Sequence, residues 1–442
     1  MIFRTLTRIA AIAAAGVLCL IVLALTLGRS MAGGDVIVAY AFDVRDNADY
    51  LVMIDTSRRF HFRKQPPIDV WRRVLFSPDG RRALIPSGAA NTLQVAHYHI
   101  ADGVLTTLPD DYADCHADIP VGAWSADSAA VVFSCEFRQR GTHIWAVDDP
   151  DNRPQSLLDR PADRVVWSPD GRYIALAVGR DLHLLSRDGT PLWILQIRDG
   201  PRAFTWSPDG ERLAFVNGAG GLSLYDIAGD SVEPLYHDGY RLDAPAWSPD
   251  GRYIAFIEGA RGELMALDMI DGGSHRLAEI DGHRMDVISR FNWSPDGGAL
   301  LSERAVHRVG EGSVYVVAAD GAWAHALSER GIIIAPVWSP DSAHAVFIDI
   351  GLTAPATNDR LRVVALHGDD PPLDVASDDG GEAYWAGSAR LMAYIRRDFS
   401  GLDVAPRQLY IWQPAGGDTT GRPLLNDAHS VIDFRFVQED SP

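Results

Sequence analysis

The sequence has little cysteine and is short of positive charge. Its 442 residues include three cysteines, and 40 lysines and arginines stand against 59 aspartates and glutamates, which gives a formal net charge of −19. Proteins that bind nucleic acid usually carry a basic stripe, and the sequence contains none. We therefore expect no nucleic-acid partner. The acidic surface is typical of a soluble domain and is also compatible with a cationic partner.

Two catalytic signatures are also missing from the sequence. An α/β-hydrolase needs a Gly-x-Ser-x-Gly nucleophile elbow to present its serine on a tight turn, and that motif does not occur. No glycine-rich phosphate loop follows a strand and opens a helix. The sequence gives no support to a hydrolase of that class or to nucleotide binding, and we assign no catalytic residue and no cofactor.

Only one long apolar run occurs, over residues 9–27, directly after Arg4 and Arg8. A helix of that length, at about 1.5 Å per residue, nearly matches the hydrocarbon thickness of a bilayer. Residues 1–32 are predicted to be a single-pass membrane anchor; a secretory signal cleaved near Ser30-Met31-Ala32 is the alternative. Both readings place the rest of the chain outside the cytoplasmic membrane, because positive charge marks the cytoplasmic side.

The most frequent feature of the sequence is a five-residue motif, which we call the repeated phrase. Trp-Ser-Pro-Asp-Gly occupies residues 167–171, 206–210, 247–251 and 293–297. A phenylalanine replaces the tryptophan at residues 76–80, and looser copies begin at Trp124, Trp338 and Trp385. The copies start 39 to 48 residues apart. A period of this size indicates a repeat architecture.

One copy, residues 204–236, shows the pattern of all the others. Four short runs rich in β-branched, aromatic and aliphatic residues are separated by Gly, Asp and Asn, as strands are separated by turns. Within Ser-Pro-Asp-Gly, the proline presets φ at the second position and the glycine suits the fourth, so the phrase predicts a type I turn. Each copy is then a four-stranded antiparallel meander, with this turn joining its first two strands.

These sheets are expected to form a single all-β domain, residues 33–442. A lone sheet would leave both faces exposed to solvent, whereas sheets stacked around an axis bury them. The repeats therefore predict a β-propeller with the repeated aromatic residue between blades. Residues 36–40, 50–54 and 60–62 look like the last three strands of a copy, and residues 431–436 look like a lone first strand. Pairing these two ends gives nine four-stranded blades, which the strand count favours; eight blades with ragged ends stays open.

The copies resemble the WD40-like propeller repeat of the TolB type. Residues 172–176 (Arg-Tyr-Ile-Ala-Leu) and 252–256 (Arg-Tyr-Ile-Ala-Phe) match the strand that follows the phrase in that family. The resemblance covers nearly all of the chain after the apolar run, and it implies a propeller that serves as a periplasmic interaction platform. The departures are Ala126 for proline, Ser128 and Ser342 for glycine, and Ala386-Gly387-Ser388-Ala389 in the last copy.

Three sets of residues have the chemistry of metal ligands. Residues 110–118 hold four carboxylates and a histidine, which suits calcium but lacks the EF-hand spacing. His97 and His99 alternate along an expected strand as two zinc ligands do, with no third ligand nearby. The third set is the ring of turn aspartates: Asp79, Asp170, Asp209, Asp250, Asp296 and Asp341. We expect a solvated loop, ordinary histidines and aspartates that stabilise their own turns, and assign no metal.

Cys115 and Cys135 flank one of the turns, whereas Cys19 lies in the apolar run. In an oxidising compartment the pair is within reach of a disulfide, which would stabilise the fold by about 3 kcal/mol. Two buried thiols that never meet are the alternative, and the sequence leaves both open.

Two functions of different classes fit this sequence. The first is a monomeric interaction module, tethered by the N-terminal helix or secreted, that binds an envelope or extracellular protein or peptide through rim loops such as residues 353–360. The second is a propeller enzyme or small-molecule sensor with a site in the central channel. Its candidates, polar residues near the ends of second strands with no role assigned, are Glu136, Arg180, Glu258, Glu303, Arg304 and Asp349. A stalk or sensor ectodomain beside a signalling protein is a third reading.

Overall fold

The computed structural model describes most of the repeat region. The described residues are 36–43, 48–55, 60–64, 75–87, 94–99, 104–108, 112, 123–135, 140–148, 153–197, 200–201, 203–217, 219–237, 242–258, 262–277, 287–305, 312–328, 332–350, 359–366, 373–377, 380–386, 392–397, 407–413, 422–423 and 429–437. The expected membrane segment, residues 1–32, lies outside them. Within the described part, no helix has the length and apolarity needed to cross a membrane.

The described residues form nine four-stranded antiparallel sheets, which we number as blades 1 to 9. Blade 1 contains β1 (Val36–Asp43), β2 (Ala48–Asp55), β3 (Phe60–Lys64) and β36 (His429–Val437); blade 2 contains β4 (Leu75–Phe76), β5 (Arg82–Ser87), β6 (Gln94–His99) and β7 (Val104–Thr107). Blade 3 contains β8 (Ala123–Trp124), β9 (Ala130–Cys135), β10 (Gly141–Ala146) and β11 (Gln155–Leu158); blade 4 contains β12 (Arg164–Trp167), β13 (Tyr173–Val178), β14 (Asp181–Ser186) and β15 (Pro191–Gln196).

The remaining blades repeat this arrangement. Blade 5 contains β16 (Phe204–Trp206), β17 (Arg212–Val216), β18 (Leu222–Asp226) and β19 (Ser231–Tyr236); blade 6 contains β20 (Leu242–Trp247), β21 (Tyr253–Glu258), β22 (Glu263–Asp268) and β23 (Ser274–Arg276). Blade 7 contains β24 (Val287–Trp293), β25 (Ala299–Ala305), β26 (Gly312–Ala318) and β27 (Ala324–Ala326). Blade 8 contains β28 (Ile332–Trp338), β29 (His344–Ile350), β30 (Asp359–Ala365) and β31 (Leu373–Ser377); blade 9 contains β32 (Gly380–Trp385), β33 (Met392–Arg397), β34 (Arg407–Trp412) and β35 (Arg422–Pro423).

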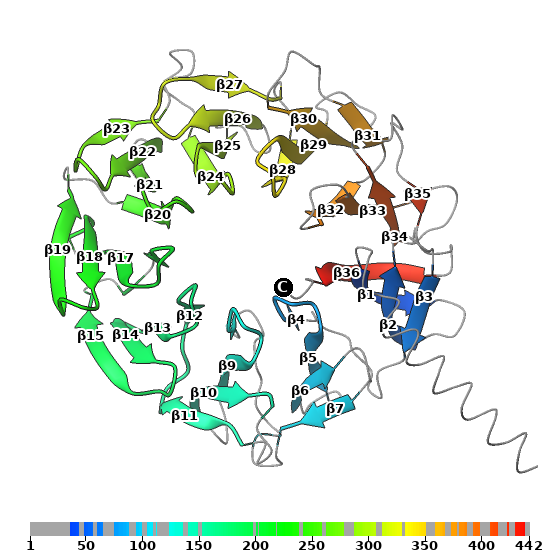
Figure 1. The fold of residues 1–442 in the computed structure, drawn as a ribbon, viewed down its shortest axis with the longest axis horizontal. Coiled ribbons are helices and arrows are strands. Elements are labelled where there is room, and N and C mark those ends of the chain that lie inside the picture. Colours follow the sequence, from blue (N-terminus) through cyan, green and yellow to red (C-terminus); the bar gives the residue numbers. More distant parts are fainter. Residues whose placement is uncertain are drawn as a thin grey trace, which may run out of the picture.

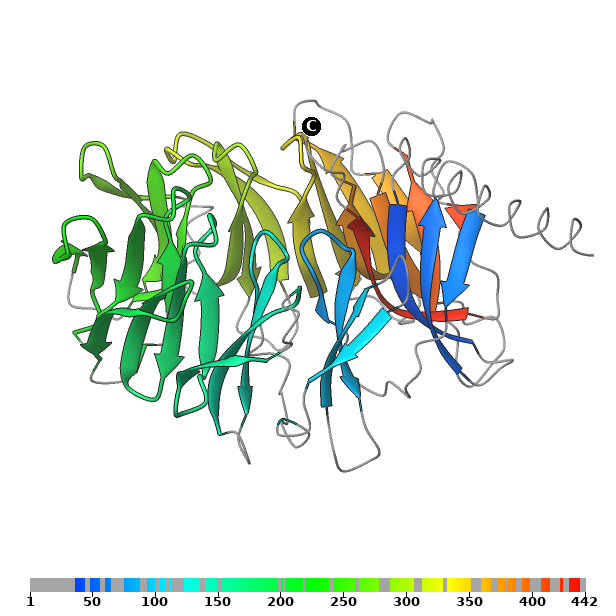
Figure 2. The same cartoon turned by 60° about the horizontal axis from the view of Figure 1, so that its bottom comes forward.

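The blades stand in a ring around a central channel, so the chain is an all-β propeller (Figure 1). The first strand of blades 2 to 9 lies innermost and the fourth lies outermost (Figure 1). Figure 2 shows the sheets side by side around the ring. The prediction of all-β repeats is confirmed, and the nine described sheets agree with the count that the strand pattern favours.

Blade 1 is built from both ends of the repeat region, as the sequence predicts. Strand β36 is the innermost strand of this sheet and pairs antiparallel with β1, from Val36 opposite Val437 to Asp43 opposite His429. The buried side chains of Ile37 and Ala39 have no exposed surface. Pairing the two ends completes the sheet of blade 1 and so avoids the exposed end faces that an open row of blades would have.

The core lies between blades, because each sheet buries both of its faces. In β13, Ile174 and Leu176 pack toward blade 3 against residues that include Val132. The intervening Ala175 and Ala177 face blade 5, where small side chains leave room for its large aromatic residues. Each fully buried large apolar side chain contributes about 1.5–3 kcal/mol relative to exposure. Alternation of large and small residues therefore sets the spacing of the blades.

The repeated tryptophan lies between blades, as expected. Trp206 is 5% exposed, and its indole Nε1–H donates to the Val166 carbonyl of blade 4 at 3.1 Å. Two more motif tryptophans also donate to a carbonyl of the preceding blade. Trp293 of blade 7 donates to Ala246 at 3.1 Å, and Trp338 of blade 8 donates to Asn292 at 3.2 Å. The motif aromatic residue is thus both an apolar filler and a hydrogen-bond donor to the neighbouring blade.

Candidate functional site: the turn face of the ring

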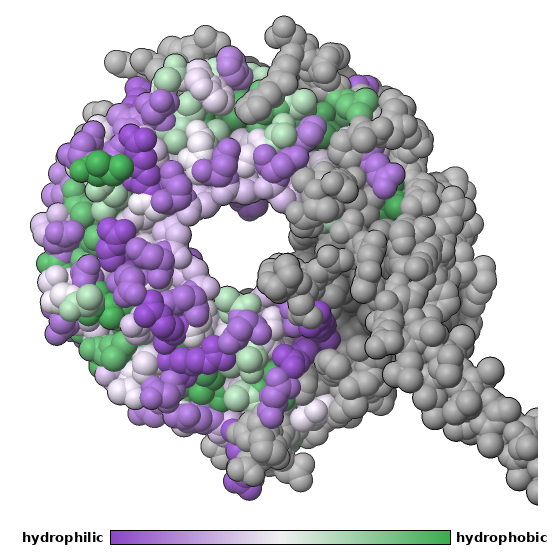
Figure 3. Space-filling view, in the orientation of Figure 1, coloured by the Kyte–Doolittle hydropathy of each residue, from purple (hydrophilic) through white to green (hydrophobic). Residues whose placement is uncertain are grey.

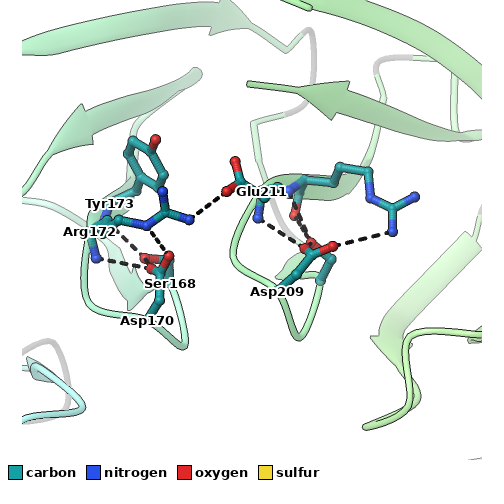
Figure 4. Close-up of polar contacts among 8 residues, drawn as sticks. Ser168, Asp170, Arg172, Tyr173, Asp209 and Glu211 are labelled. Atoms are coloured by element: carbon teal, nitrogen blue, oxygen red, sulfur yellow. Dashed lines mark hydrogen bonds and ion pairs between the residues drawn. The ribbon is translucent and has the colours of Figure 1, made fainter. Parts of the chain in front are cut away.

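The repeated phrase forms a turn that its own side chains lock. In blade 4, the Ser168 hydroxyl donates to Asp170 Oδ1 at 2.6 Å, and the Arg172 N–H donates to the same oxygen at 3.0 Å. The Tyr173 N–H donates to Ser168 Oγ at 2.9 Å, and the Gly171 N–H closes the turn on the Ser168 carbonyl at 2.9 Å. Figure 4 shows this turn beside the equivalent turn of blade 5. The aspartate stabilises its turn, as predicted.

Seven described turns share this arrangement and lie at one end of the ring, which we call the turn face. They comprise residues 77–80, 125–128, 168–171, 207–210, 248–251, 294–297 and 339–342, and in each the serine hydroxyl donates to the aspartate at 2.5–2.6 Å. Asp127, absent from the predicted series because its copy reads Ser-Ala-Asp-Ser, belongs to it. Each turn follows an innermost strand, so together they surround the mouth of the channel.

Hydrogen bonding keeps five of these carboxylates ionised. Partial burial works to raise the pKa of Asp170, but bonds from Ser168 and Arg172 outweigh it and hold that pKa below its usual value. The pKa values of four other turn aspartates are lowered by the same balance of causes: Asp127, Asp209, Asp296 and Asp341. The turn face therefore keeps its negative charge well below neutral pH.

Neighbouring turns touch each other. The φ of Gly210 is +72°, and a Cβ at this residue would lie 2.8 Å from the Asp170 carboxylate carbon. Where serine replaces glycine, its hydroxyl bonds to the turn of the preceding blade instead. Ser128 Oγ accepts the Asp79 N–H, and Ser342 Oγ accepts the Asp296 N–H, each at 3.1 Å. Among the described turns, contacts of this kind join several neighbouring blades.

Arginines add a second set of links between blades. The Arg172 guanidinium lies between its own Asp170 and Glu211 of blade 5, 2.5 Å from the Glu211 carboxylate (Figure 4). Arg187 reaches back to Asp127 of blade 3 at 2.8 Å. Solvent screens such exposed pairs, so they orient the side chains more than they stabilise the fold.

Two large apolar side chains are exposed on the outer turns of the turn face. Ile270 is 80% exposed and follows Met269, whose N–H donates to the Arg252 carbonyl beside the blade 6 turn at 2.8 Å. Trp323 is 43% exposed and stacks on His325, with ring centroids 5.3 Å apart. In blade 7, the Ala319 N–H donates to the Gly298 carbonyl at 3.0 Å, which places this turn at the same end.

These two residues were not predicted as site residues. Both stand in turns between third and fourth strands, outside the repeated phrase, where an apolar residue has no core to face. A tryptophan directly after Asp320-Gly321-Ala322 was the available sequence signal, since turns are usually polar. Exposed acidic residues stand beside both, Asp271 and Asp320.

The described channel candidates come from four blades. Arg180 is in blade 4, Glu258 in blade 6, Glu303 and Arg304 in blade 7, Asp349 in blade 8, and Glu136 lies outside the described residues. Glu258 is buried at 3% exposure, whereas Arg180 is exposed. Asp349 forms an ion pair with Arg362 of its own sheet at 2.8 Å. Figure 3 shows an open channel whose coloured border is mostly hydrophilic to intermediate in hydropathy.

The structure describes two of the three sets of residues with the chemistry of metal ligands. Within the described part of the chain, no group of three His, Cys, Asp or Glu residues is placed to hold a metal ion. His97 and His99 lie in β6, opposite Leu84 and Arg82 of β5. In the acidic loop 110–118, every carboxylate and the histidine lie outside the described residues.

Cys135 is disulfide-bonded and fully buried at the end of β9. Cys115, the partner that the sequence suggests, lies outside the described residues.

The fold is similar to solved structures of several proteins. A eukaryotic initiation factor is 12% identical with a TM-score of 0.61, over 92% of this chain and 98% of that chain. Porphyromonas gingivalis dipeptidyl peptidase 4 is 12% identical with a TM-score of 0.55, over 81% of this chain and 60% of that chain. A dihydro-heme d1 dehydrogenase is 14% identical with a TM-score of 0.50, over 91% and 75%. Identities this low show a shared fold only. No protein-family model and no curated protein matches the sequence.

Proposed function

We propose that the chain is an interaction module that binds a protein or peptide through its turn face. The observation that carries this proposal is the exposure of Ile270 and Trp323 on the turns of neighbouring blades at one end of the ring. Exposed aromatic and aliphatic residues surrounded by polar ones mark protein-binding surfaces, and tryptophan is enriched among the residues that dominate binding energy.

The rigidity of the turn face supports this role. Its turns are fixed by hydrogen bonds within each blade and by contacts between blades, so little conformational entropy is lost when a partner binds. The acidic residues Asp271 and Asp320 beside the two anchors favour a partner with basic residues around an apolar centre.

We place this module outside the cytoplasmic membrane, tethered or secreted, in the manner of the TolB-type repeats that it resembles. The apolar run at residues 9–27 and the disulfide at Cys135 support that location.

Capture of partners by crosslinking the native full chain tests this function. The Ile270→Ser, Trp323→Ser double variant removes both anchors, while Val232→Ser, at a residue 47% exposed on outer strand β19, is the matched control. We expect a saturable partner with wild type and with Val232→Ser, absent from the double variant and from an unrelated anchored propeller. A partner that binds the double variant equally well would exclude the turn face, and capture of nothing above background would exclude the interaction role.

A small-molecule site in the channel, with or without catalysis, is the second candidate. Ala244, exposed on innermost strand β20, has a φ of 49°, beside a bulge between Asp243 and Ala246. A non-glycine residue in this region costs about 1–2 kcal/mol, and strained residues gather at functional sites. Compounds that raise the melting temperature of wild type but not of Ala244→Gly would favour this site. Equal shifts in both proteins would argue against it.

A further inference from the structure

Strand β15 is the outermost strand of blade 4, and no described strand pairs with its outer edge (Figure 1). The sheet order is β12-β13-β14-β15, so the outer N–H and C=O groups of β15 have no partner strand within the sheet. Such an edge is a template for a further strand unless the protein blocks it with charge, proline or shortness.

The other outermost strands are blocked in these ways. Strand β3 carries Arg63 and Lys64, β19 carries Glu233 and Pro234, and β31 carries Asp374. Strands β7, β11, β23, β27 and β35 have four residues or fewer. Strand β15, Pro-Leu-Trp-Ile-Leu-Gln, has six residues, no charge, and its only proline at the first position. Among the nine described outermost strands it alone is long and unblocked.

One face of β15 is anchored in the core. The Trp193 ring stacks on Tyr225 of blade 5 with centroids 4.3 Å apart and planes 9° apart, and Leu195 packs against the same cluster. This anchoring holds the strand in its sheet and keeps its free edge in a fixed position.

The other face of β15 presents apolar side chains to solvent. Ile194 lies opposite His183 of β14, on the sheet face away from blade 5, and is 56% exposed. Leu192 is the extra residue of a bulge and is 42% exposed. The regular ladder runs from Trp193 to Gln196, so four residues offer an undistorted edge.

We propose that this edge binds an extended peptide segment of a partner protein, which adds to blade 4 as a fifth strand. Backbone hydrogen bonds supply the affinity in this mode, and alternate side chains, here against Leu192 and Ile194, supply the selectivity. The segment is apolar at alternate positions. This surface is separate from the turn face and does not depend on the function proposed there.

A partner segment fits this edge better than a second copy of the chain. Six residues span about 20 Å, and one such strand pair buries far less than the about 1,600 Å² typical of a stable protein interface. Two copies, each with a net charge of −19, also repel one another, whereas a segment with basic flanks is attracted. The occupant is therefore a short apolar segment flanked by lysine or arginine.

Random heptapeptides displayed on phage, selected against the full chain in detergent, test the proposal. Ile194→Lys places a charge on the edge at an exposed position, and Val232→Lys makes the same change on the already blocked strand β19. We expect enriched peptides to alternate apolar residues, to bind Ile194→Lys at least tenfold more weakly than wild type, and to bind Val232→Lys as wild type does. Methylating alternate backbone nitrogens of a bound peptide is expected to abolish binding.

Three outcomes would overturn the proposal. In the first, selection enriches no peptide beyond those that bind Ile194→Lys; in the second, the enriched peptides bind both lysine variants equally. Alternatively, wild type is a dimer that Ile194→Lys converts to a monomer, which would make a second copy the occupant. Equal melting temperatures of the two lysine variants exclude misfolding as the cause. Peptides that also bind the Ile270→Ser, Trp323→Ser variant separate this edge from the turn face.

Discussion

At the scale of single residues, the turn face shows how one position accepts two different amino acids. Five of the seven described turns end in glycine, and Ser128 and Ser342 end the other two with φ values of 59°. Serine in the left-handed region costs about 1–2 kcal/mol. The hydrogen bond from the preceding blade offsets that cost. A glycine adopts the same φ without the cost, so a turn that ends in glycine needs no such bond.

Replacing Ser342 separates these two contributions. We expect Ser342→Ala to lose about 1 kcal/mol of unfolding free energy, because the Asp296 N–H loses its acceptor while the φ cost stays. Ser342→Gly loses the same bond but relieves the backbone at a φ of 59°, so it is expected to be about 1 kcal/mol more stable than Ser342→Ala. Denaturant unfolding of both variants measures the difference, and equal losses would contradict this account.

His183 is the residue whose burial gives the clearest dependence on pH. It is 7% exposed, and neither ring nitrogen has a hydrogen-bond partner among the described residues. Burial lowers its pKa; the charge of Asp181 opposes that shift and the charge of Arg160 adds to it. The unfolded chain therefore takes up the proton first as the pH falls, and stability contributed by the neutral form is lost below about pH 6.5.

His183→Leu is expected to flatten this part of the stability profile. Wild type should lose more unfolding free energy than the variant between about pH 7.5 and pH 5, because only wild type gains a proton at this position on unfolding. Denaturant midpoints across this range provide the measurement, with the difference between the two proteins near pH 8 as the baseline. Parallel profiles would show that His183 is hydrated or paired in solution.

At the scale of strands and turns, the sequence predicts what depends on neighbouring residues in the chain. Ser-Pro-Asp-Gly specifies its turn through its own side chains, so the seven turns and the strands around them were predictable. The bulge in β20 was not predicted, although Pro245, which lacks an N–H for the ladder, stands two residues before Trp247. The exposure of Ile270 and Trp323 depends on how adjoining blades pack, which no local pattern reveals.

Two tryptophans between blades allow the contribution of the indole hydrogen bond to stability to be measured separately from that of ring packing. Trp206 and Trp247 are 5% and 7% exposed, but Trp247 Nε1 has no hydrogen-bond partner among the described residues, whereas Trp206 donates to Val166. Phenylalanine removes similar volume at both sites, but only Trp206→Phe also removes a hydrogen bond to the neighbouring blade. We expect Trp206→Phe to be destabilised by about 1 kcal/mol more than Trp247→Phe.

Unfolding of the two phenylalanine variants in denaturant, with thermal melts as a second readout, measures that difference. A larger loss for Trp247→Phe would show that its ring contact with the Arg212 guanidinium, 5.0 Å from the ring centroid, outweighs the missing hydrogen bond of Trp206.

At the scale of the whole molecule, the ring depends on one strand that joins the two ends of the repeat region. Each blade contacts mainly its two neighbours, so an open row of blades would unfold from its ends, as linear repeat proteins do. Strand β36 removes those ends by pairing with β1 along its length. The ring is then expected to unfold as a unit, because no blade is terminal.

Deleting residues 429–442 should convert this ring into an open row. We expect unfolding at lower denaturant concentration and in more than one step, with fast amide exchange first in β1 and β2, because β1 loses the strand that pairs with it along its length. Deleting residues 439–442 alone leaves β36 intact and is the matched control. Adding a peptide of residues 429–437 is expected to restore protection to β1. A single unchanged transition in the larger deletion would mean that contacts between blades 1, 2 and 9 close the ring without β36, and that the composite blade follows from closure rather than causing it.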